Sequence, residues 1–124
     1  MFAVEGVAPG WAVYSTTRRY AGGAEYAVGG VVIEVLPGYT DADTGEIRPP
    51  RFKCVDRYRP EHPWQYLDAP EVDTSLLNGV DRLAATGAAL YLLRQIPAKR
   101  RLFRPDDVAL IHDAWILAKA AARL

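Results

Sequence analysis

Apolar and polar residues alternate in the first part of the chain and recur at helical spacing in the second part. The clearest alternation lies in residues 31–35, Val-Val-Ile-Glu-Val, within a predicted strand that spans about residues 24–36. Further strands are predicted at residues 11–20 and 51–58. Val32 and Glu34 are expected to point outward. The expected core residues of this sheet are Trp11, Val31, Ile33, Val35, Phe52 and Val55.

Glycine and proline divide these strands into short, bent segments. Seven of the nine prolines and eight of the ten glycines fall in the first seventy residues. The pair Gly29-Gly30 lies inside a predicted strand and indicates a bulge or a bend. Residues 37–50 are predicted to form a hairpin loop with its tip at residues 41–45. The proline-rich segment that follows is predicted to be extended, with Trp64 anchored on the core.

Two motifs in this region resemble the first two strands of SH3-like barrels. They are Pro-Gly-x-x-Val, which starts at Pro9, and Gly-Val-Val-x-x-Val, which starts at Gly30. The resemblance covers about thirty residues and implies a small, strongly curved sheet of antiparallel strands.

The second part of the chain predicts an antiparallel helical hairpin. Asp73 is a suitable N-cap for a first helix that ends just before Pro97. Pro105 suits the first position of a second helix, and two aspartates follow it in the first turn. Trp115 is expected to be buried between the helices and the sheet. The wide apolar stripe of the second helix comprises Val108, Leu110, Ile111, Trp115, Leu117, Ala118, Ala121 and Ala122.

These patterns predict one α+β domain over residues 1–124. Its β-rich part, residues 1–70, is expected to be a small SH3-like barrel or a curled antiparallel sheet, and residues 71–124 the helical hairpin. A chain of 124 residues, half of them hydrophobic, can bury one modest core.

The overall charge does not indicate which class of partner the chain binds. Fifteen acidic and fifteen basic side chains cancel, so no global field draws the chain to nucleic acid or to an anionic membrane. The single cysteine, Cys54, excludes an internal disulfide and suits a reducing compartment. Neither a signal peptide nor an apolar run long enough to span a membrane is recognisable. A cytoplasmic location, or a place in a soluble assembly such as a virion, is therefore expected.

No motif indicates catalysis, a cofactor or a metal ion. Asp43-Thr44-Gly45 matches the aspartic protease tripeptide, but its flanking residues belong to a polar turn and not to an apolar strand. The carboxylates around this turn lack the spacing of a calcium loop. The two histidines, His62 and His112, and Cys54 lack the spacing of zinc ligands. Cys54 is expected to be a core residue and not a nucleophile.

A basic strand is one candidate binding surface. Its cations are interleaved with Phe52 and Tyr58, an arrangement that suits nucleic acid or an acidic protein. The alternative is that Glu34, Glu46 and Asp56 neutralise the strand. The basic residues concerned are Arg48, Arg51, Lys53, Arg57 and Arg59.

Two further candidate surfaces lie in the helical part. On the first helix, the small or apolar residues Ala85, Ala89 and Leu92 lie on a face that is expected to be exposed to solvent. This indicates that a partner helix covers the face, and the simplest case is a symmetric homodimer. The alternative is a helix enclosed between the sheet and the second helix. The link between the helices offers Arg100, Arg101, Phe103 and Arg104 as partner-binding residues.

The function expected from these features is that of a small non-catalytic protein-interaction module with an unidentified protein partner. A phage or mobile-element protein, as a virion component or an inhibitor of a host system, is one class that fits. That class rests on how common compact domains of this kind are in such genomes and on no particular residue. The alternatives are a nucleic-acid-binding module that uses the basic strand and an enzyme, which would show a deep pocket with converging polar groups.

Overall fold

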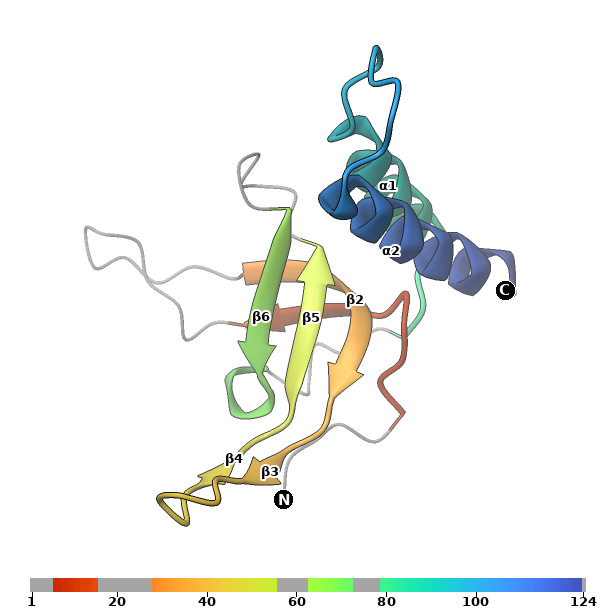
Figure 1. The fold of residues 1–124 in the computed structure, drawn as a ribbon. Helices are drawn as coiled ribbons and strands as arrows, with labels where there is room; N and C mark the ends of the chain where they lie inside the picture. The colour runs from red at the N-terminus through yellow and green to blue at the C-terminus, as the bar shows by residue number, and fades with distance from the viewer. Residues whose placement is uncertain (1–5, 16–27, 56–62, 73–78, 124) are drawn as a thin grey trace, which may run out of the picture.

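The structure is a computed structural model of the chain, and it describes residues 6–15, 28–55, 63–72 and 79–123. Four strands form a curled antiparallel half-barrel sheet in the order β1-β2-β5-β6 (Figure 1). Two helices, α1 (Arg82–Arg94) and α2 (Pro105–Ala122), follow and pack on one side of the sheet. The α+β fold predicted from the sequence is confirmed. The four strands are β1 (Ala12–Ser15), β2 (Val28–Leu36), β5 (Arg51–Val55) and β6 (Trp64–Asp68).

Shorter elements connect the main ones. The strands β3 (Tyr39–Thr40) and β4 (Ile47–Arg48) pair with each other and extend the β2–β5 connection away from the sheet. The hairpin predicted for residues 37–50 is thus present. A 3-10 turn, η1 (Ala69–Glu71), follows β6. The segment around Trp64, predicted to be extended, is the fourth strand of the sheet and pairs with β5.

Strand β2 bends so that it pairs with two neighbours. Its first residues pair with β1 and its later residues with β5, and Figure 1 shows the strand curving between them. Gly29 and Gly30 stay in regular register with β1. A Cβ atom at Gly30 would lie 2.7 Å from the Cβ of Cys54, so glycine is needed here because β2 and β5 approach closely.

The bulge of the sheet lies at Ile33, just beyond the glycines. Val32 is opposite Cys54, and the next pair is Glu34 with Lys53, so Ile33 is an extra residue without a partner. One extra residue shifts the alternation of side chains between the two faces. Ile33 and Glu34 consequently both lie on the side of the helices. Val32 is fully buried on the opposite side, and the expectation that it points outward is wrong; Glu34 is exposed as expected.

Each face of the sheet has its own buried cluster. On the helical side, Val31, Ile33 and Val55 pack with residues of α1 and α2. The curled strands enclose the second cluster around Phe52, Cys54 and Leu67, none of which has exposed surface. Cys54 is therefore a core residue, as predicted. Of the six expected core residues, Val31, Ile33, Phe52 and Val55 are buried, and Trp11 and Val35 are partly buried.

Helix α1 begins later than the sequence pattern predicts. Asp81 is its N-cap, because Asp81 Oδ1 accepts a hydrogen bond of 3.0 Å from the backbone N–H of Ala84. Val80, which was expected to be helical, forms a bridge with the sheet instead. The predicted N-cap, Asp73, lies outside the described residues.

Helix α2 begins at Pro105, as predicted. Asp107 in its first turn accepts a hydrogen bond of 2.9 Å from the backbone N–H of Arg104. Figure 1 shows α1 and α2 side by side, joined by the link at one end of the hairpin. The antiparallel helical hairpin is therefore confirmed.

The expected burial of Trp115 is wrong, because this side chain is 57% exposed. Small residues occupy the contact between the helices, chiefly Ala85, Ala88 and Ala114, and none of the three is exposed by more than 3%. Alanines at a helix contact let the backbones come close and leave no room for an indole. The predicted apolar stripe is real but wider than the buried face. Its core part consists of Leu110, Ala114, Leu117 and Ala121.

Candidate partner-binding groove

The exposed part of the apolar stripe borders a groove between α1 and α2. The groove has a volume of about 680 Å³ and is lined by residues of the two helices alone. Arg82 and Thr86 are its polar residues. Its apolar lining residues are Ala89, Leu90, Leu93, Ile111, Ala114, Trp115, Ala118, Ala121 and Ala122.

Helical periodicity explains why these residues share one groove. Positions 82, 86, 89–90 and 93 on α1 recur every three or four residues, as do positions 111, 114–115, 118 and 121–122 on α2. Such positions follow one side of a helix. Each helix therefore turns one stripe toward the core and a second, adjacent stripe toward the groove.

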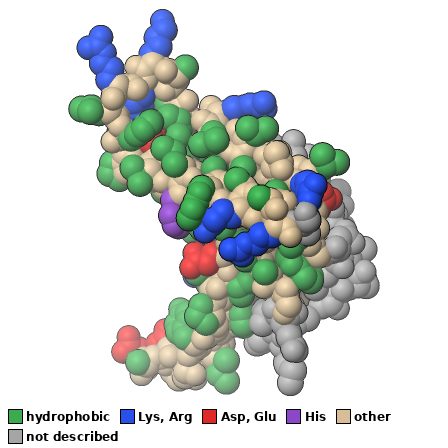
Figure 2. Space-filling model, turned by 90° about the vertical axis from the view of Figure 1, so that its right-hand side faces the viewer, with side chains coloured by type: hydrophobic (Ala, Val, Ile, Leu, Met, Phe, Trp, Pro, Cys, Tyr) green, Lys and Arg blue, Asp and Glu red, His purple; other side chains and the backbone are tan. Residues whose placement is uncertain are grey.

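The large side chains of the groove are open to solvent. Leu90 is 47% exposed, Leu93 42% and Trp115 57%. Figure 2 shows hydrophobic side chains gathered over this helical side of the molecule, with Lys and Arg side chains among them and at the end of the hairpin. Burying one large apolar side chain fully is worth about 1.5–3 kcal/mol, so a partner that covers several of them gains binding free energy.

Trp115 also positions a charge at the edge of the groove. The Nζ atom of Lys119, one turn further along α2, lies 3.5 Å from the centroid of the Trp115 ring. This cation–π contact fixes an ammonium group beside an apolar surface. The groove is thus apolar inside and basic at its edge.

The first helix residues predicted to meet a partner are buried inside the chain. Ala85 and Leu92 have no exposed surface, and Ala89 is 6% exposed in the cluster between the helices and the sheet. The structure therefore matches the alternative in which α1 is enclosed on that face. The apolar surface left for a partner belongs instead to Leu90, Leu93 and α2.

At the link between the helices, Arg100 has a structural role that the sequence did not reveal. Its Nη1 atom lies 3.1 Å from Oδ2 of Asp107, a carboxylate that is 6% exposed. Arg101, Phe103 and Arg104 are exposed. Partner binding by this link stays a prediction, and of its two central arginines Arg101 is the one whose replacement leaves Asp107 paired.

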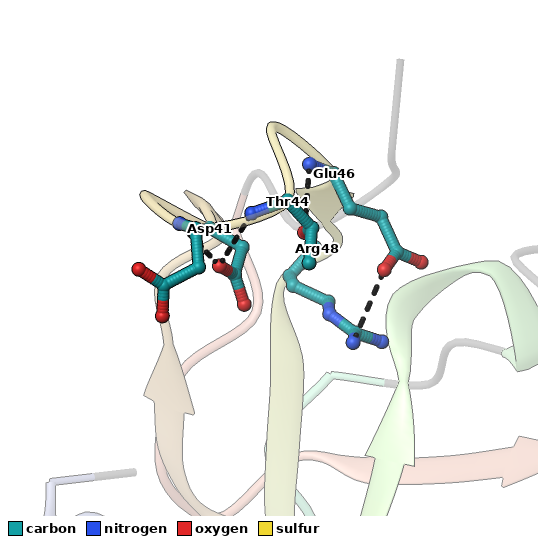
Figure 3. A network of polar contacts seen from close by, with 5 residues as sticks. Asp41, Thr44, Glu46 and Arg48 are labelled. Carbon is teal, nitrogen blue, oxygen red and sulfur yellow. Dashed lines mark hydrogen bonds and ion pairs between the residues drawn. The ribbon is translucent and has the colours of Figure 1, made fainter.

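The three described residues of the basic strand each contact another residue of the fold. Arg48 pairs with Glu46 at 3.2 Å in the exposed β3–β4 hairpin (Figure 3). The guanidinium of Arg51 lies 5.3 Å from the ring centroid of Tyr66. Lys53 pairs with a buried carboxylate of α2. The remaining members, Arg57 and Arg59, lie outside the described residues, as do Asp56 and Tyr58.

The Asp-Thr-Gly tripeptide lies in the turn of that same hairpin, as expected. Asp41 Oδ1 accepts hydrogen bonds from the backbone N–H groups of Asp43, at 2.8 Å, and Thr44, at 3.2 Å (Figure 3). These bonds are typical of an Asx turn. The tripeptide is an exposed turn.

A second depression, of about 740 Å³, lies between β2, β5 and α2 and contains polar side chains. Lys53 Nζ lies 2.9 Å from Asp113 Oδ2, and His112 Nδ1 lies 3.4 Å from Asp113 Oδ1. Glu34 and His112 are exposed. The lining contains no Ser, Thr, Cys or Tyr that could act as a nucleophile. The ion pair Lys53–Asp113 ties the sheet to α2.

The described residues form neither a metal-binding cluster nor a membrane-spanning helix. Over residues 6–15, 28–55, 63–72 and 79–123, no three His, Cys, Asp or Glu side chains gather so as to hold a metal ion. Within the same described residues, no helix has the length and apolar character needed to cross a bilayer. Comparison with known proteins finds no matching family model, no matching curated protein and no matching solved structure.

The sequence predicted an apolar surplus on the first helix, but at three residues that the fold buries. The sequence of α2 did contain a signal for the groove surface, because its apolar stripe is wider than the single face that packs against the core. Leu90 and Leu93 carried no separate signal, because which side of α1 faces the core depends on the packing of α2 against it.

Proposed function

We propose that this chain is a small non-catalytic protein-interaction module that binds a protein partner through the α1–α2 groove. The observation that carries the proposal is the exposure of Leu90, Leu93 and Trp115 around a groove with an almost wholly apolar lining. Contiguous exposed apolar surface of this kind marks interaction sites more often than a scatter of single exposed residues does.

The alternatives receive less support from the described residues. A nucleic-acid surface on the basic strand would need available cations, whereas Arg48 and Lys53 are paired with carboxylates. A homodimer through Ala85, Ala89 and Leu92 would need residues that the fold buries. A role in a phage or mobile element, as a virion component or an inhibitor, belongs to the same proposal and is supported only by the small size of the domain.

The test compares three immobilised forms of the protein as baits for proteins from its source cells: the unmodified chain, Leu90→Glu and Leu83→Glu. Leu83 is a matched control because it lies on the same helix, is 85% exposed and does not line the groove. Proteins retained by the unmodified chain and by Leu83→Glu, but lost with Leu90→Glu, are the expected result.

Retention of the same proteins by all three baits would exclude the groove as the binding surface. Binding of DNA or RNA by the unmodified chain, with an affinity that falls steeply as salt increases, would favour the nucleic-acid-binding alternative. Light scattering on the purified chain decides whether it is a homodimer.

A further inference from the structure

We infer that the occupant of the groove is an amphipathic α-helix of a different protein, apolar along the face that enters the groove and acidic toward the ends of that face. The inference rests on the proposed function, because it takes the groove to be the binding surface. It adds the secondary structure and the charge of the partner.

The shape of the groove suits a third helix. Its two walls are antiparallel helices, and α1, with 13 residues, provides a wall about 20 Å long. Several of its lining residues are alanines, which let a third backbone approach to the usual interaxial distance of about 8–10 Å. A helix of about four turns would lie along the whole groove.

An extended segment would fit the same surface poorly. The backbone groups of α1 and α2 are bonded within the helices, so an extended peptide would find no sheet edge here to pair with. Its own N–H and C=O groups would lie on an apolar floor without partners, which is costly. A helix bonds these groups internally and presents side chains alone.

The charges near the groove specify an acidic partner. Residues 79–124 contain eight Lys and Arg but four Asp and Glu, so this part carries a formal charge of +4 in a chain that is neutral overall. Two of the four acidic residues, Asp107 and Asp113, are buried against Arg100 and Lys53. The other two, Asp81 and Asp106, are exposed at the starts of α1 and α2, so the eight basic side chains outnumber the acidic ones that remain exposed in this part.

Basic residues stand close to both ends of the groove. Arg82 lines the end formed by the start of α1, and Lys119 stacks on Trp115 near the end of α2. Arg94 follows the groove residue Leu93 at the opposite end of α1. Carboxylates at the ends of a docked helix would meet Lys119 and Arg94.

The same charges disfavour a second copy of this chain as the occupant. A symmetric contact through the groove would bring two surfaces of the same positive sign together, and like charges that face each other across an interface are repulsive. Residues 79–124 contain four aspartates and no glutamate against eight Lys and Arg, and two of the aspartates are buried, so this repulsion is only partly relieved.

The experiment selects binders to the full-length protein from a displayed library of twenty-residue peptides with random sequence. The expected result is enrichment of sequences with apolar residues at spacings of three and four, an excess of Asp and Glu toward the ends, and no central proline. Enriched peptides that lack helical spacing, or that carry Lys and Arg at the ends, would overturn the inference, and so would a failure to enrich any peptide.

One enriched acidic peptide is then titrated, by fluorescence anisotropy, against four forms of the protein. Leu90→Glu should weaken binding by at least about tenfold, because it places a carboxylate among the apolar contacts and near the acidic ends. Lys119→Glu should weaken binding by about threefold to tenfold and reduce its salt dependence. Leu83→Glu should bind like the unmodified chain, and equal weakening by all three variants would refute the groove as the site.

Failure of this inference can be told apart from failure of the proposed function. If the bait experiment shows Leu90-dependent capture but the library yields uncharged or non-helical peptides, the groove binds proteins and only the acidic helix is wrong. If the captured proteins are indifferent to Leu90→Glu, the groove itself is refuted. If light scattering shows a dimer that Leu90→Glu dissociates, the occupant is a second copy.

Discussion

The four-stranded sheet and the helical hairpin differ in how many of their large apolar side chains are exposed to solvent. Among the residues of the four strands whose side chains the structure describes, Tyr66 is the only large hydrophobic one left exposed, and Arg51 lies over its ring. The helices leave five such side chains exposed. They are Leu83, Leu90, Leu93, Val108 and Trp115. Tyr39 and Ile47 of the β3–β4 hairpin are exposed as well, but among the described residues the helices expose more large apolar side chains than the sheet does, which makes them the better candidate for contact with a partner.

The two parts also differ in charge. Residues 1–78 contain eleven acidic and seven basic side chains, and residues 79–124 contain four acidic and eight basic ones. The formal charges of −4 and +4 cancel in the whole chain. The neutral composition thus conceals a basic helical half, and the following predictions test how far the two halves differ.

The largest effect is expected from Phe52→Ala in the sheet. Phe52 has no exposed surface and lies in the cluster enclosed by the curled strands. Removing the ring leaves a cavity, and the free energy of unfolding should fall by about 3–5 kcal/mol. Urea denaturation followed by circular dichroism measures this change. A loss below about 1 kcal/mol would mean that the sheet core is not as closed as the structure shows.

A smaller effect is expected from Asp113→Ala, which breaks the ion pair between the sheet and α2. Asp113 is 6% exposed and its partner Lys53 20%, so the substitution should lower the free energy of unfolding by about 1–3 kcal/mol. The matched control is Glu46→Ala, which breaks an exposed pair with Arg48 and should cost at most about 0.5 kcal/mol. Equal effects in denaturant melts would show that the Lys53–Asp113 pair does not hold the two halves together.

At the link, Arg100→Ala and Arg101→Ala should differ. Arg100 neutralises the buried Asp107, and its loss should cost about 1–2 kcal/mol of unfolding free energy. Arg101 is exposed, so its replacement should change the free energy of unfolding by no more than about 0.5 kcal/mol. If partner binding falls with Arg101→Ala at unchanged stability, the link takes part in binding as the sequence suggested.

The smallest effect on stability is expected from Trp115→Ala. With 57% of its surface exposed, Trp115 contributes little to the core, and the free energy of unfolding should fall by less than about 1 kcal/mol. Affinity for the partner should nevertheless fall, because indoles at interfaces often carry much of the binding energy. If the free energy of unfolding fell as much as in Phe52→Ala, Trp115 would be a buried residue, as the sequence predicted.

Local signals made much of the fold predictable. Alternation in β2, the turn residues of the β3–β4 hairpin and Pro105 at the start of α2 each act within a few residues, and each prediction is confirmed. Val32 was placed wrongly because the bulge at Ile33 depends on how β2 matches β5. Trp115 was placed wrongly because the contact between the helices is set by alanines on both of them.

Contacts between distant segments, including the packing of α1 against α2 that forms the groove, were less predictable for the same reason. Lys53 and Asp113 are 60 residues apart, and no spacing in the sequence indicates that they meet. The start of α1 at Arg82 depends on Asp81 as the cap and on Val80 bridging to the sheet. Features that need two distant segments in register lie beyond a reading of one sequence.

The alanines that line the groove have a consequence for the entropy of binding. Alanine has no side-chain torsion that burial could freeze, so covering the two exposed alanines, Ala118 and Ala122, costs no rotamer freedom. A surface of lysines or methionines would lose up to about 2 kcal/mol per side chain on the same event. At these two positions the groove can therefore be covered without any change of rotamer, and the cost of ordering side chains falls on Leu90, Leu93 and Trp115.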